Sequence, residues 1–211
     1  MDLEVERVAE LEQSLSPDEA ARADRFHSAA DRRRFIAARG SLRAVLSEYL
    51  HVKANQIQFA YTPDQKPILA HPVLAPEATL YFNVSHSDAL ALIAVVRGRE
   101  IGIDLERLRA DFDPDALAKR FFSPIEYAAL SKMPPQERHH DFLTYWVCKE
   151  AYLKAQGTGL RHPLNEFTVS LEDHSIQLAR PTGTGQTIAP YHLQPFSPTL
   201  GYVAAVAVEV R

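Results

Sequence analysis

The order in which helix-like and strand-like patterns follow one another occurs twice along the chain, and this repetition limits the fold more than any other feature. Each half contains a long segment with apolar residues at helical spacing, then a short strand-like segment with a Phe, and finally a strand rich in Ala and Val. These segments are 30–49, 57–59 and 90–96 in the first half, and 142–156, 166–168 and 202–210 in the second. The halves share little sequence identity, so the duplication is inferred from the pattern. It predicts two similar lobes of helix and sheet that meet near Gly98, with a cleft between them that can hold a ligand.

The remaining elements are indicated by caps, turns and alternation. Ser16-Pro17-Asp18-Glu19 and Ser123-Pro124-Ile125-Glu126 are capping boxes with Pro at the first helical position, and each begins a helix. Prolines between residues 63 and 76 indicate an irregular segment, and residues 85–88 read as a polar turn. Further strands are expected at residues 56–62, 80–84, 101–105, 166–171, 175–179 and 191–196.

Bulk properties exclude several classes of protein. The composition, 46% hydrophobic and 24% charged, is that of a globular protein. The net charge of −4 argues against general polyanion binding, so an anion site must be a local cluster of Arg and Lys. Cys148 is the only cysteine, which rules out an intrachain disulfide and a multi-Cys zinc site and fits a reducing compartment. We find neither a signal-peptide pattern nor the roughly 20 apolar residues of a membrane span, so we expect a cytoplasmic protein.

Two carboxylates stand on one side of a predicted strand. In Ile101-Gly102-Ile103-Asp104-Leu105-Glu106, alternation places Asp104 and Glu106 together and the apolar residues opposite them. Adjacent carboxylates repel each other unless they are solvated or share a cation, and oxygen ligands suit magnesium. An antiparallel strand with one face in water gives the same pattern, so both interpretations stay open at this point.

The second predicted long helix carries Glu150 and Lys154, four residues apart on one face. A surface ion pair would explain this spacing. However, Trp146 lies on the same face, and the rest of the helix is apolar almost all round, which indicates burial. Buried charges need partners, and a shared metal ion would satisfy Glu150 while a phosphate would satisfy Lys154. Cys148, in the middle of this helix, is most simply a core residue.

Several cations could bind phosphate. Arg32, Arg39 and Arg43 form one stripe on the first long helix, and guanidinium groups bind phosphate oxygens bidentately. Lys66 lies in a stiff loop before a proline, and the Ser85-His86 turn offers hydroxyl, imidazole and backbone donors. A solvated helix face and a structural histidine are the alternative interpretations. The chain lacks the P-loop, Rossmann, His-Glu-x-x-His and Cys-x-x-Cys motifs.

Taken together, these segments resemble the 4′-phosphopantetheinyl transferase superfamily, in particular the two-lobed class that activates nonribosomal peptide and polyketide synthetases. The resembling motifs stand in the family's order: Arg22-x-x-Arg25-Phe26 through Ala38-Arg39-x-x-Leu42-Arg43, Lys66-Pro67, Phe82-Asn83-Val84-Ser85-His86-Ser87, Ile101-Gly102-Ile103-Asp104-Leu105-Glu106, Arg120-Phe121-Phe122-Ser123-x-x-Glu126, and Trp146-x-x-Lys149-Glu150-Ala151-Tyr152-x-Lys154-Ala155-x-Gly157-x-Gly159-Leu160. The pair formed by Gly-Ile-Asp-x-Glu and Trp-x-x-Lys-Glu is the most specific part.

The resemblance implies an α+β fold of two pseudo-symmetric lobes, each an antiparallel sheet packed on a long helix. Residues 1–98 would form the coenzyme A-binding lobe, and residues 99–211 the lobe with the metal and the catalytic helix. The implied reaction moves the 4′-phosphopantetheine arm of coenzyme A to a serine of an apo acyl or peptidyl carrier protein and releases adenosine 3′,5′-bisphosphate. A monomer suffices for this reaction, and neither nucleic acid nor membrane is an expected partner.

The resemblance also implies roles for individual residues. Asp104, Glu106 and Glu150 would hold Mg²⁺ against the pyrophosphate. Glu150, directly or through a water, would be the base for the carrier serine, and Lys154 would stabilise charge on the phosphate oxygens. The implied coenzyme contacts are Arg25, Arg39, Lys66, Ser85, His86, Lys149 and Lys154.

Two positions depart from the family pattern. Gln65 stands where the family often has a Gly before Lys-Pro, which predicts a different local turn. Phe35 stands where some relatives have a small hydroxyl residue, which removes a possible 3′-phosphate contact. The same carboxylates would also suit a magnesium-dependent hydrolase of a nucleotide pyrophosphate, and the cations would suit a non-catalytic coenzyme A-binding module.

Overall fold

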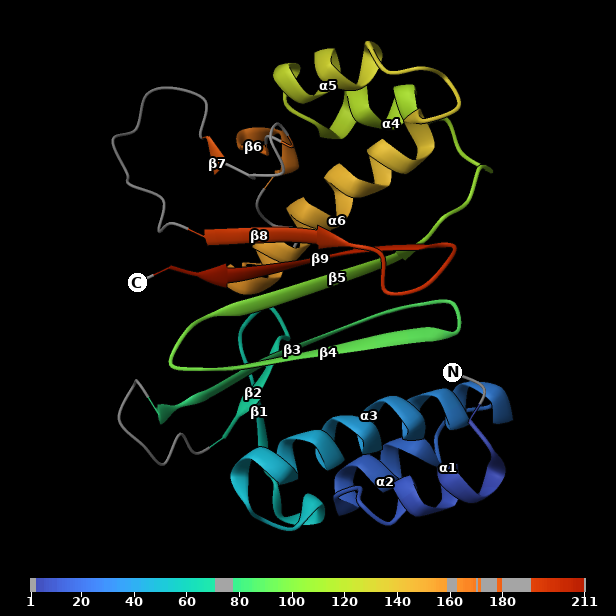
Figure 1. Cartoon of the computed structure of the whole chain (residues 1–211). Coiled ribbons are helices and arrows are strands. Elements are labelled where there is room, and N and C mark those ends of the chain that lie inside the picture. The colour runs from blue at the N-terminus through green and yellow to red at the C-terminus, as the bar shows by residue number, and fades with distance from the viewer. Residues whose placement is uncertain are drawn as a thin grey trace.

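Two antiparallel sheets, each packed against one long helix, form the body of the molecule in the computed structural model (Figure 1). The structure describes residues 3–70, 78–158, 163–169, 171, 178–179 and 191–210. The helices are α1 Val5–Glu12, α2 Pro17–Ala23, α3 Ala29–Leu50, α4 Pro114–Phe121, α5 Pro124–Ser131 and α6 Arg138–Gln156, with 3-10 turns at Ala54–Gln56 and Leu164–Glu166. The strands are β1 Phe59–Tyr61, β2 Pro67–Leu69, β3 Leu80–Ser87, β4 Leu90–Arg97, β5 Ile101–Arg107, β6 Thr168–Val169, β7 Leu178–Ala179, β8 Tyr191–Phe196 and β9 Tyr202–Glu209.

The sheets are built from antiparallel pairs. β3 and β4 form a hairpin, and β9 lies between β5 and β8 in the order β5-β9-β8. The short pairs β1-β2 and β6-β7 are also antiparallel. This confirms the predicted α+β class with antiparallel sheets. None of the described helices is long and apolar enough to cross a membrane.

The first half has its core between α3 and the β3-β4 hairpin. Leu42 and Leu46 of α3 are buried against Leu80 and Phe82 of β3. A second cluster joins α1 to α3, where Leu11 and Ile36 are buried. In Figure 1 the helices α1, α2 and α3 therefore lie together on one side of this hairpin.

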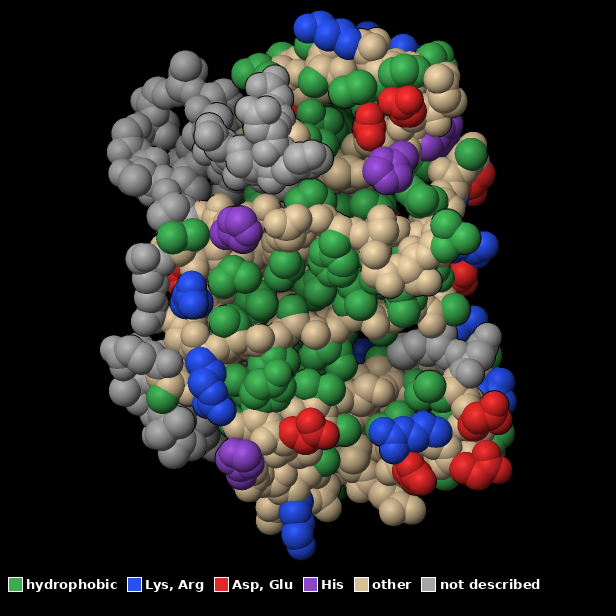
Figure 2. Space-filling view, in the orientation of Figure 1, with side chains coloured by type: hydrophobic (Ala, Val, Ile, Leu, Met, Phe, Trp, Pro, Cys, Tyr) green, Lys and Arg blue, Asp and Glu red, His purple; other side chains and the backbone are tan. Residues whose placement is uncertain are grey.

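The second half has the larger core, centred on α6. Its residues are buried almost all round, as the sequence predicts, and they pack on β5, β8 and β9 and on α4 and α5. Alternate residues of β9, such as Val203, Ala205 and Ala207, point toward α6. On the face shown in Figure 2, hydrophobic side chains also gather over the centre of the strands.

A buried ion pair ties the long helix to a capping box in the first half. Arg43 of α3 is 1% exposed, and its Nε lies 2.5 Å from Oε2 of Glu19, the last residue of the α2 capping box. Its Nη1 donates to the carbonyl oxygens of Ala54 and Ile57, beside the 3-10 turn that follows α3. The helix ends at His51, which has a positive φ of 56°.

The second half repeats this arrangement with other residues. Lys149 of α6 is 0% exposed, and its Nζ lies 2.8 Å from Oε1 of Glu126, the last residue of the α5 capping box. The Nζ also donates to the carbonyl oxygens of Leu164 and Phe167, beside the 3-10 turn that follows α6. α6 ends at Gly157, with a φ of 71°. Each half therefore has a buried ion pair between a capping box and the long helix that follows it, which supports the inferred duplication.

The structure differs from the sequence-based expectations at several elements. The expected polar turn at 85–88 is wrong, because β3 continues to Ser87 and the turn is only Asp88-Ala89. Helices α1 and α4 and strand β2 were not predicted, and the strand expected at 56–62 is confined to β1. Pro72, Pro76, Gly159, and residues 170 and 175–177 of two expected strands lie outside the described residues.

Candidate active site

Gly102 lets β5 and α6 approach closely enough to combine their charged residues. A Cβ at this position would lie 2.0 Å from the carbonyl oxygen of Ala151 and 2.4 Å from the backbone nitrogen of Ala155, which no side chain allows. Asp104 and Glu106 follow on the same side of β5, because side chains alternate along a strand. In α6, Glu150 directly precedes the contacted Ala151, and Lys154 directly precedes the contacted Ala155. The carboxylates and Lys154 therefore meet where the strand crosses the helix.

Asp104 is the centre of this cluster. The residue is 5% exposed, and one of its oxygens, Oδ1, accepts two hydrogen bonds. Lys154 Nζ donates to it at 2.6 Å and Ser85 Oγ donates to it at 2.9 Å. Lys154 Nζ also lies 3.0 Å from Ser85 Oγ. Ser85 comes from the first half and the other two residues from the second, so the site lies where the halves meet.

The electrostatics of the cluster favour an added positive charge. Burial raises the pKa of Asp104, and Lys154 and Ser85 offset part of this effect. Burial likewise raises the pKa of Glu106. The pKa of Glu150 rises to about 7, first through burial and then through the charge of Asp104, although Lys154 lowers it. Three carboxyl groups that disfavour one another's charge form a natural binding site for a cation.

The residues present fit a hard divalent ion. Asp104 Oδ2 and Glu150 Oε1 are buried side-chain oxygens with no hydrogen-bond partner, and such atoms are costly unless something binds them. Carboxylate oxygens are the ligands that Mg²⁺ prefers. Among the described residues, no three acidic, His or Cys side chains already converge on one point. Asp104, Glu106 and Glu150 thus offer suitable donors, which are not yet gathered around one point.

Ser87 and Asn83 belong to the same region and were not predicted as site residues. Ser87 Oγ donates to Glu106 Oε2 at 3.0 Å, and Asn83 Oδ1 accepts the N–H of Ile103 at 2.9 Å. Together with Ser85 these residues occupy alternate positions of β3. The sequence does contain a signal for them, because polar residues alternate at positions 83, 85 and 87 as they do at 104 and 106. The serines and Asp88, however, are also typical of a turn, which is what the sequence analysis predicts here.

Lys149 lies elsewhere, so the expectation that it assists at the phosphates is wrong. Its three N–H groups are used by Glu126, Leu164 and Phe167, and the Nζ also lies 4.0 Å from the centre of the Phe167 ring. A fully buried ammonium group with these partners has no donor left for a ligand. The residue therefore holds α6 in place.

The two arginines expected at the coenzyme lie apart from the carboxylates, in the first half. Arg39 Nε is 3.3 Å from Glu19 Oε1, and its Nη2 donates to the hydroxyl of Tyr61 at 3.0 Å. Its Nη1 is buried without a hydrogen-bond partner among the described residues, which leaves the two N–H groups of this nitrogen available. Arg25 is exposed on the surface after α2.

His86 and Ser85 do not point to the same place. Ser85 is buried beside Asp104, whereas His86 is exposed at the end of β3. Adjacent residues of a strand point to opposite faces, so the structure does not bring the imidazole to the Asp104 cluster.

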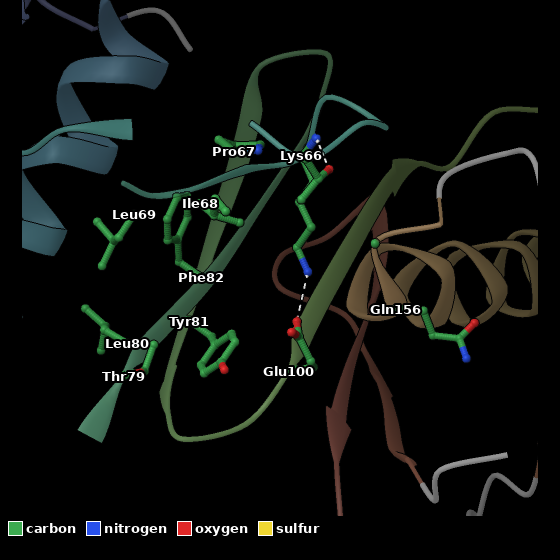
Figure 3. A pocket seen from close by; sticks show the side chains of 12 residues that line it. Lys66, Pro67, Ile68, Leu69, Thr79, Leu80, Tyr81, Phe82, Glu100 and Gln156 are labelled. Atoms are coloured by element: carbon green, nitrogen blue, oxygen red, sulfur yellow. Dashed lines mark hydrogen bonds and ion pairs between the residues drawn. The ribbon is translucent and has the colours of Figure 1, made fainter. Parts of the chain in front are cut away.

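Lys66 borders a cavity of about 320 Å³ between the β1-β2 hairpin, β3 and the end of α6 (Figure 3). Its Nζ donates to Glu100 Oε2 at 3.3 Å and to the carbonyl oxygen of Ala155 in the last turn of α6 at 3.1 Å. Burial lowers the pKa of Lys66, and Glu100 opposes this shift. Apolar side chains, including Tyr81 and Phe82, form the wall opposite these charges.

A smaller cavity, of about 160 Å³, opens beside Glu106. Apart from Glu106 and Arg109, its walls are apolar, and they include Phe121 and Trp146. The two rings meet edge to face, with centres 5.8 Å apart. An apolar surface therefore lies directly against the acidic cluster.

Comparisons with known proteins show the family to which the chain belongs. The model of the 4′-phosphopantetheinyl transferase superfamily matches residues 100–207, and that of the 4′-phosphopantetheinyl transferase N-terminal domain matches residues 5–97. The chain is 45% identical over 204 residues to the 4′-phosphopantetheinyl transferase HetI of Nostoc sp., covering 96% of this chain and 81% of that protein. It is 31% identical over 195 residues to Sfp of Bacillus subtilis, covering 91% and 81%.

Among solved structures, a holo-(acyl-carrier-protein) synthase from Bacillus anthracis in complex with CoA (3′,5′-ADP) aligns at 24% identity and a TM-score of 0.44, over 52% of this chain and 94% of that one. The family models together account for most of both halves, and the two named relatives are each matched over 81% of their own length. The chain therefore belongs to the 4′-phosphopantetheinyl transferase superfamily.

Proposed function

We propose that this protein transfers the 4′-phosphopantetheine arm of coenzyme A to a serine of an apo acyl or peptidyl carrier protein. The observation that carries the proposal is the acidic cluster formed by the buried Asp104 and the half-buried Glu106 and Glu150, in which Lys154 binds Asp104. Phosphoryl transfer requires positioning and neutralisation of spreading negative charge, which such a group can supply once it holds a cation. Family membership supports the same reaction.

Each residue of the cluster has a distinct task. The carrier serine Oγ forms a bond to the phosphorus that bears the pantetheine, and the bond from this phosphorus to the bridging oxygen breaks. Glu150, directly or through a water, accepts the serine proton, because an ionised carboxylate beside the reacting phosphate is a suitable base. Lys154 places positive charge on the bridging oxygen that leaves with adenosine 3′,5′-bisphosphate.

We assign the magnesium site to Asp104, Glu106 and Glu150. Mg²⁺ bound there would neutralise pyrophosphate oxygens and offset the repulsion among the three carboxylates. The unpartnered oxygens of Asp104 and Glu150 support this assignment. Ser85 fixes the orientation of Asp104 from the other half of the chain.

Coenzyme A has room for its nucleotide beside Lys66. The cavity there has apolar walls and charged groups at one side, which suits a purine with its ribose phosphates. Asp104 is three residues along β5 from Ile101, whose carbonyl oxygen Lys66 Nζ contacts at 3.5 Å. That corresponds to about 10 Å along a strand, a distance that a bent nucleotide diphosphate spans. The apolar cavity beside Glu106 lies on the opposite side, where acceptor and pantetheine arm have to meet.

The chain supplies both sides of this site, with Ser85 from the first half and Asp104, Glu150 and Lys154 from the second. We therefore propose that it acts as a monomer on coenzyme A and a carrier protein. The cytoplasmic location expected from the sequence remains a prediction.

Incubation with coenzyme A, Mg²⁺ and an apo carrier protein tests the proposal. The expected result is a mass gain of one phosphopantetheine on the carrier, together with adenosine 3′,5′-bisphosphate. A carrier whose acceptor serine is replaced by alanine should gain no mass. Release of adenosine 3′,5′-bisphosphate without carrier would instead indicate a pyrophosphate hydrolase.

The variant Glu150→Gln provides the second arm of this test. The amide cannot accept the serine proton, so the transfer rate should fall by about 10²- to 10⁴-fold. Gln58→Glu, on the surface of the first half, changes charge away from the site and serves as the control. Coenzyme A binding with no turnover by the wild type would identify a binding module and refute the transferase.

A further inference from the structure

β3 and β5 lie side by side where the two halves meet, but the described part of the chain shows no backbone ladder between them. Side chains of β3 make the connection instead. Asn83 Oδ1 accepts the N–H of Ile103 at 2.9 Å, and Ser87 Oγ accepts the N–H of Arg107 at 3.0 Å. Each bond therefore joins a β3 side chain to the backbone of β5. Ser85, midway between Asn83 and Ser87, extends the same row.

We propose that Ser85 and Ser87 are positioning residues that hold the two strand carboxylates so that each presents its second oxygen to the cation. The proposal rests on the magnesium site assigned under the proposed function. It deepens that function, because it assigns to the first half of the chain control over metal ligands that belong to the second. Ligating carboxylates are commonly oriented by such outer hydrogen bonds.

Asp104 shows the effect most clearly. Two side-chain donors, Ser85 Oγ at 2.9 Å and Lys154 Nζ at 2.6 Å, bind the same oxygen, Oδ1. The other oxygen, Oδ2, is buried and has no hydrogen-bond partner in the described structure. The two donors thus fix the plane of the carboxylate and keep Oδ2 available.

Ser87 acts on Glu106 in a corresponding way. Its hydroxyl proton goes to Glu106 Oε2 at 3.0 Å, and its oxygen accepts the Arg107 N–H. A hydroxyl has one proton to donate, so the second bond fixes the direction of the first. Without Ser87 the longer Glu106 side chain, which is only half-buried, would be free to turn toward solvent.

Cation binding by the purified protein distinguishes this role from a bond that merely joins the halves. Mn²⁺ is used as the probe for Mg²⁺, and its dissociation constant is measured by electron paramagnetic resonance. Ser87→Ala should weaken Mn²⁺ binding by about 10-fold, within the range known for outer-shell changes at metal sites. Ser87→Thr keeps the hydroxyl and should bind Mn²⁺ like the wild type. At saturating Mg²⁺, the KM for coenzyme A of Ser87→Ala should be unchanged.

Ser131→Ala is the matched control, because within the described residues its hydroxyl bonds only to the Tyr127 carbonyl oxygen of its own helix. It should leave Mn²⁺ affinity as in the wild type. If Ser87→Ala loses only thermal stability and keeps Mn²⁺ affinity, or if Ser87→Thr loses as much affinity as Ser87→Ala, the positioning role is wrong. A wild type that binds Mn²⁺ but fails to load any carrier would refute the transferase while leaving the serine role supported.

Discussion

Lys149 and Glu150 are neighbours in the sequence, yet they lie on different faces of α6 and have different roles. Lys149 enters the core and meets Glu126, with both side chains fully buried. Glu150 faces the acidic cluster, and one of its buried oxygens has no hydrogen-bond partner within the described residues. Since the first charge is satisfied by protein groups and the second is not, only Glu150 has capacity left for a ligand or a proton. An unused hydrogen-bonding or metal-binding atom thus distinguishes the site residues from the structural ones.

Lys149→Met tests the structural assignment of Lys149. The change leaves Glu126 as a buried charge without its partner, so the free energy of unfolding should fall by about 3–5 kcal/mol, as measured by urea denaturation. Adding Glu126→Gln should recover part of this loss. The exposed Lys53 provides the control, since Lys53→Met should change stability by less than about 0.5 kcal/mol. A large rise in the KM for coenzyme A with unchanged stability would contradict the assignment.

Gln65 occupies a backbone conformation that favours glycine. Its φ is +63°, in the left-handed region, and the turn it forms delivers Lys66 to the end of α6. This explains why the family often has Gly at this position. Gln65→Gly should raise the unfolding free energy by about 0.5–1 kcal/mol, because relief of backbone strain exceeds the entropy cost of glycine.

The control for this turn is Gln13, which ends α1 with a right-handed φ of −65°. Gln13→Gly relieves no strain there and should lower the unfolding free energy by about 0.5–1 kcal/mol. Opposite signs for the two variants, measured by thermal and urea denaturation, support the conformational explanation. Equal signs would mean that the Gln65 side chain contributes more than its backbone strain costs.

At the scale of elements, the crossing of β5 over α6 decides the geometry of the site. Gly102 can lie against the α6 backbone at Ala151 and Ala155 because it has no Cβ. The buried pair of Lys149 and Glu126 holds α6 from its other side. Together these contacts fix where Glu150 and Lys154 stand relative to the carboxylates of β5.

Gly102→Ala should therefore affect both stability and chemistry. The added methyl group forces the strand away from the helix, at a cost of about 1–3 kcal/mol in unfolding free energy. Because Asp104 moves with the strand, transfer activity per folded molecule should fall at least 10-fold. The test is a carrier-loading assay normalised to the folded fraction.

Gly201→Ala is the matched control for this variant. Gly201 has a φ of +82° but open space where a Cβ would lie, so alanine there adds strain without a clash. It should lower stability by about 1–2 kcal/mol and leave the activity of the folded molecules unchanged. If both variants lose activity equally, the close approach at Gly102 is not what sets the site.

Elements with their own periodicity or caps could be predicted from the sequence, whereas elements that depend on a tertiary partner could not. The helix α3 and the strand β8 stand where the pattern placed them, and α6 ends where expected but begins at Arg138 instead of residue 142. The end of β3 was missed because Ser85 and Ser87 are turn-forming residues by composition, and their partners lie on β5. Likewise, the all-round apolar pattern of α6 predicted burial but not which of its two lysines faces the core. The acidic cluster itself was predicted from alternation, helical spacing and the family resemblance, although its role as a metal site remains a proposal.

At the scale of the whole molecule, a repeated scaffold carries a site that is not repeated. The ion pair of Glu19 with Arg43 corresponds to that of Glu126 with Lys149, and each connects a capping box to a long helix. The residue after Lys149 in α6 is Glu150, whereas the residue after Arg43 in α3 is Ala44. The two family models meet between residues 97 and 100, close to the predicted division at residue 98. The three carboxylates of the site thus belong to the second half, and the first half supplies Ser85 and Ser87, which orient those of β5.

A site shared in this way predicts that ligands stabilise both halves together. Urea denaturation should show one transition, and coenzyme A with Mg²⁺ at about 100 times their dissociation constants should raise the unfolding free energy by about 2.7 kcal/mol. Removal of Mg²⁺ with a chelator should abolish most of this gain, because the carboxylates then repel the pyrophosphate. Asp104→Asn should reduce the gain even with Mg²⁺ present. If two transitions appear and the ligands shift only one of them, the halves unfold independently, and the contacts between β3 and β5 cannot couple the first half to the metal ligands of the second.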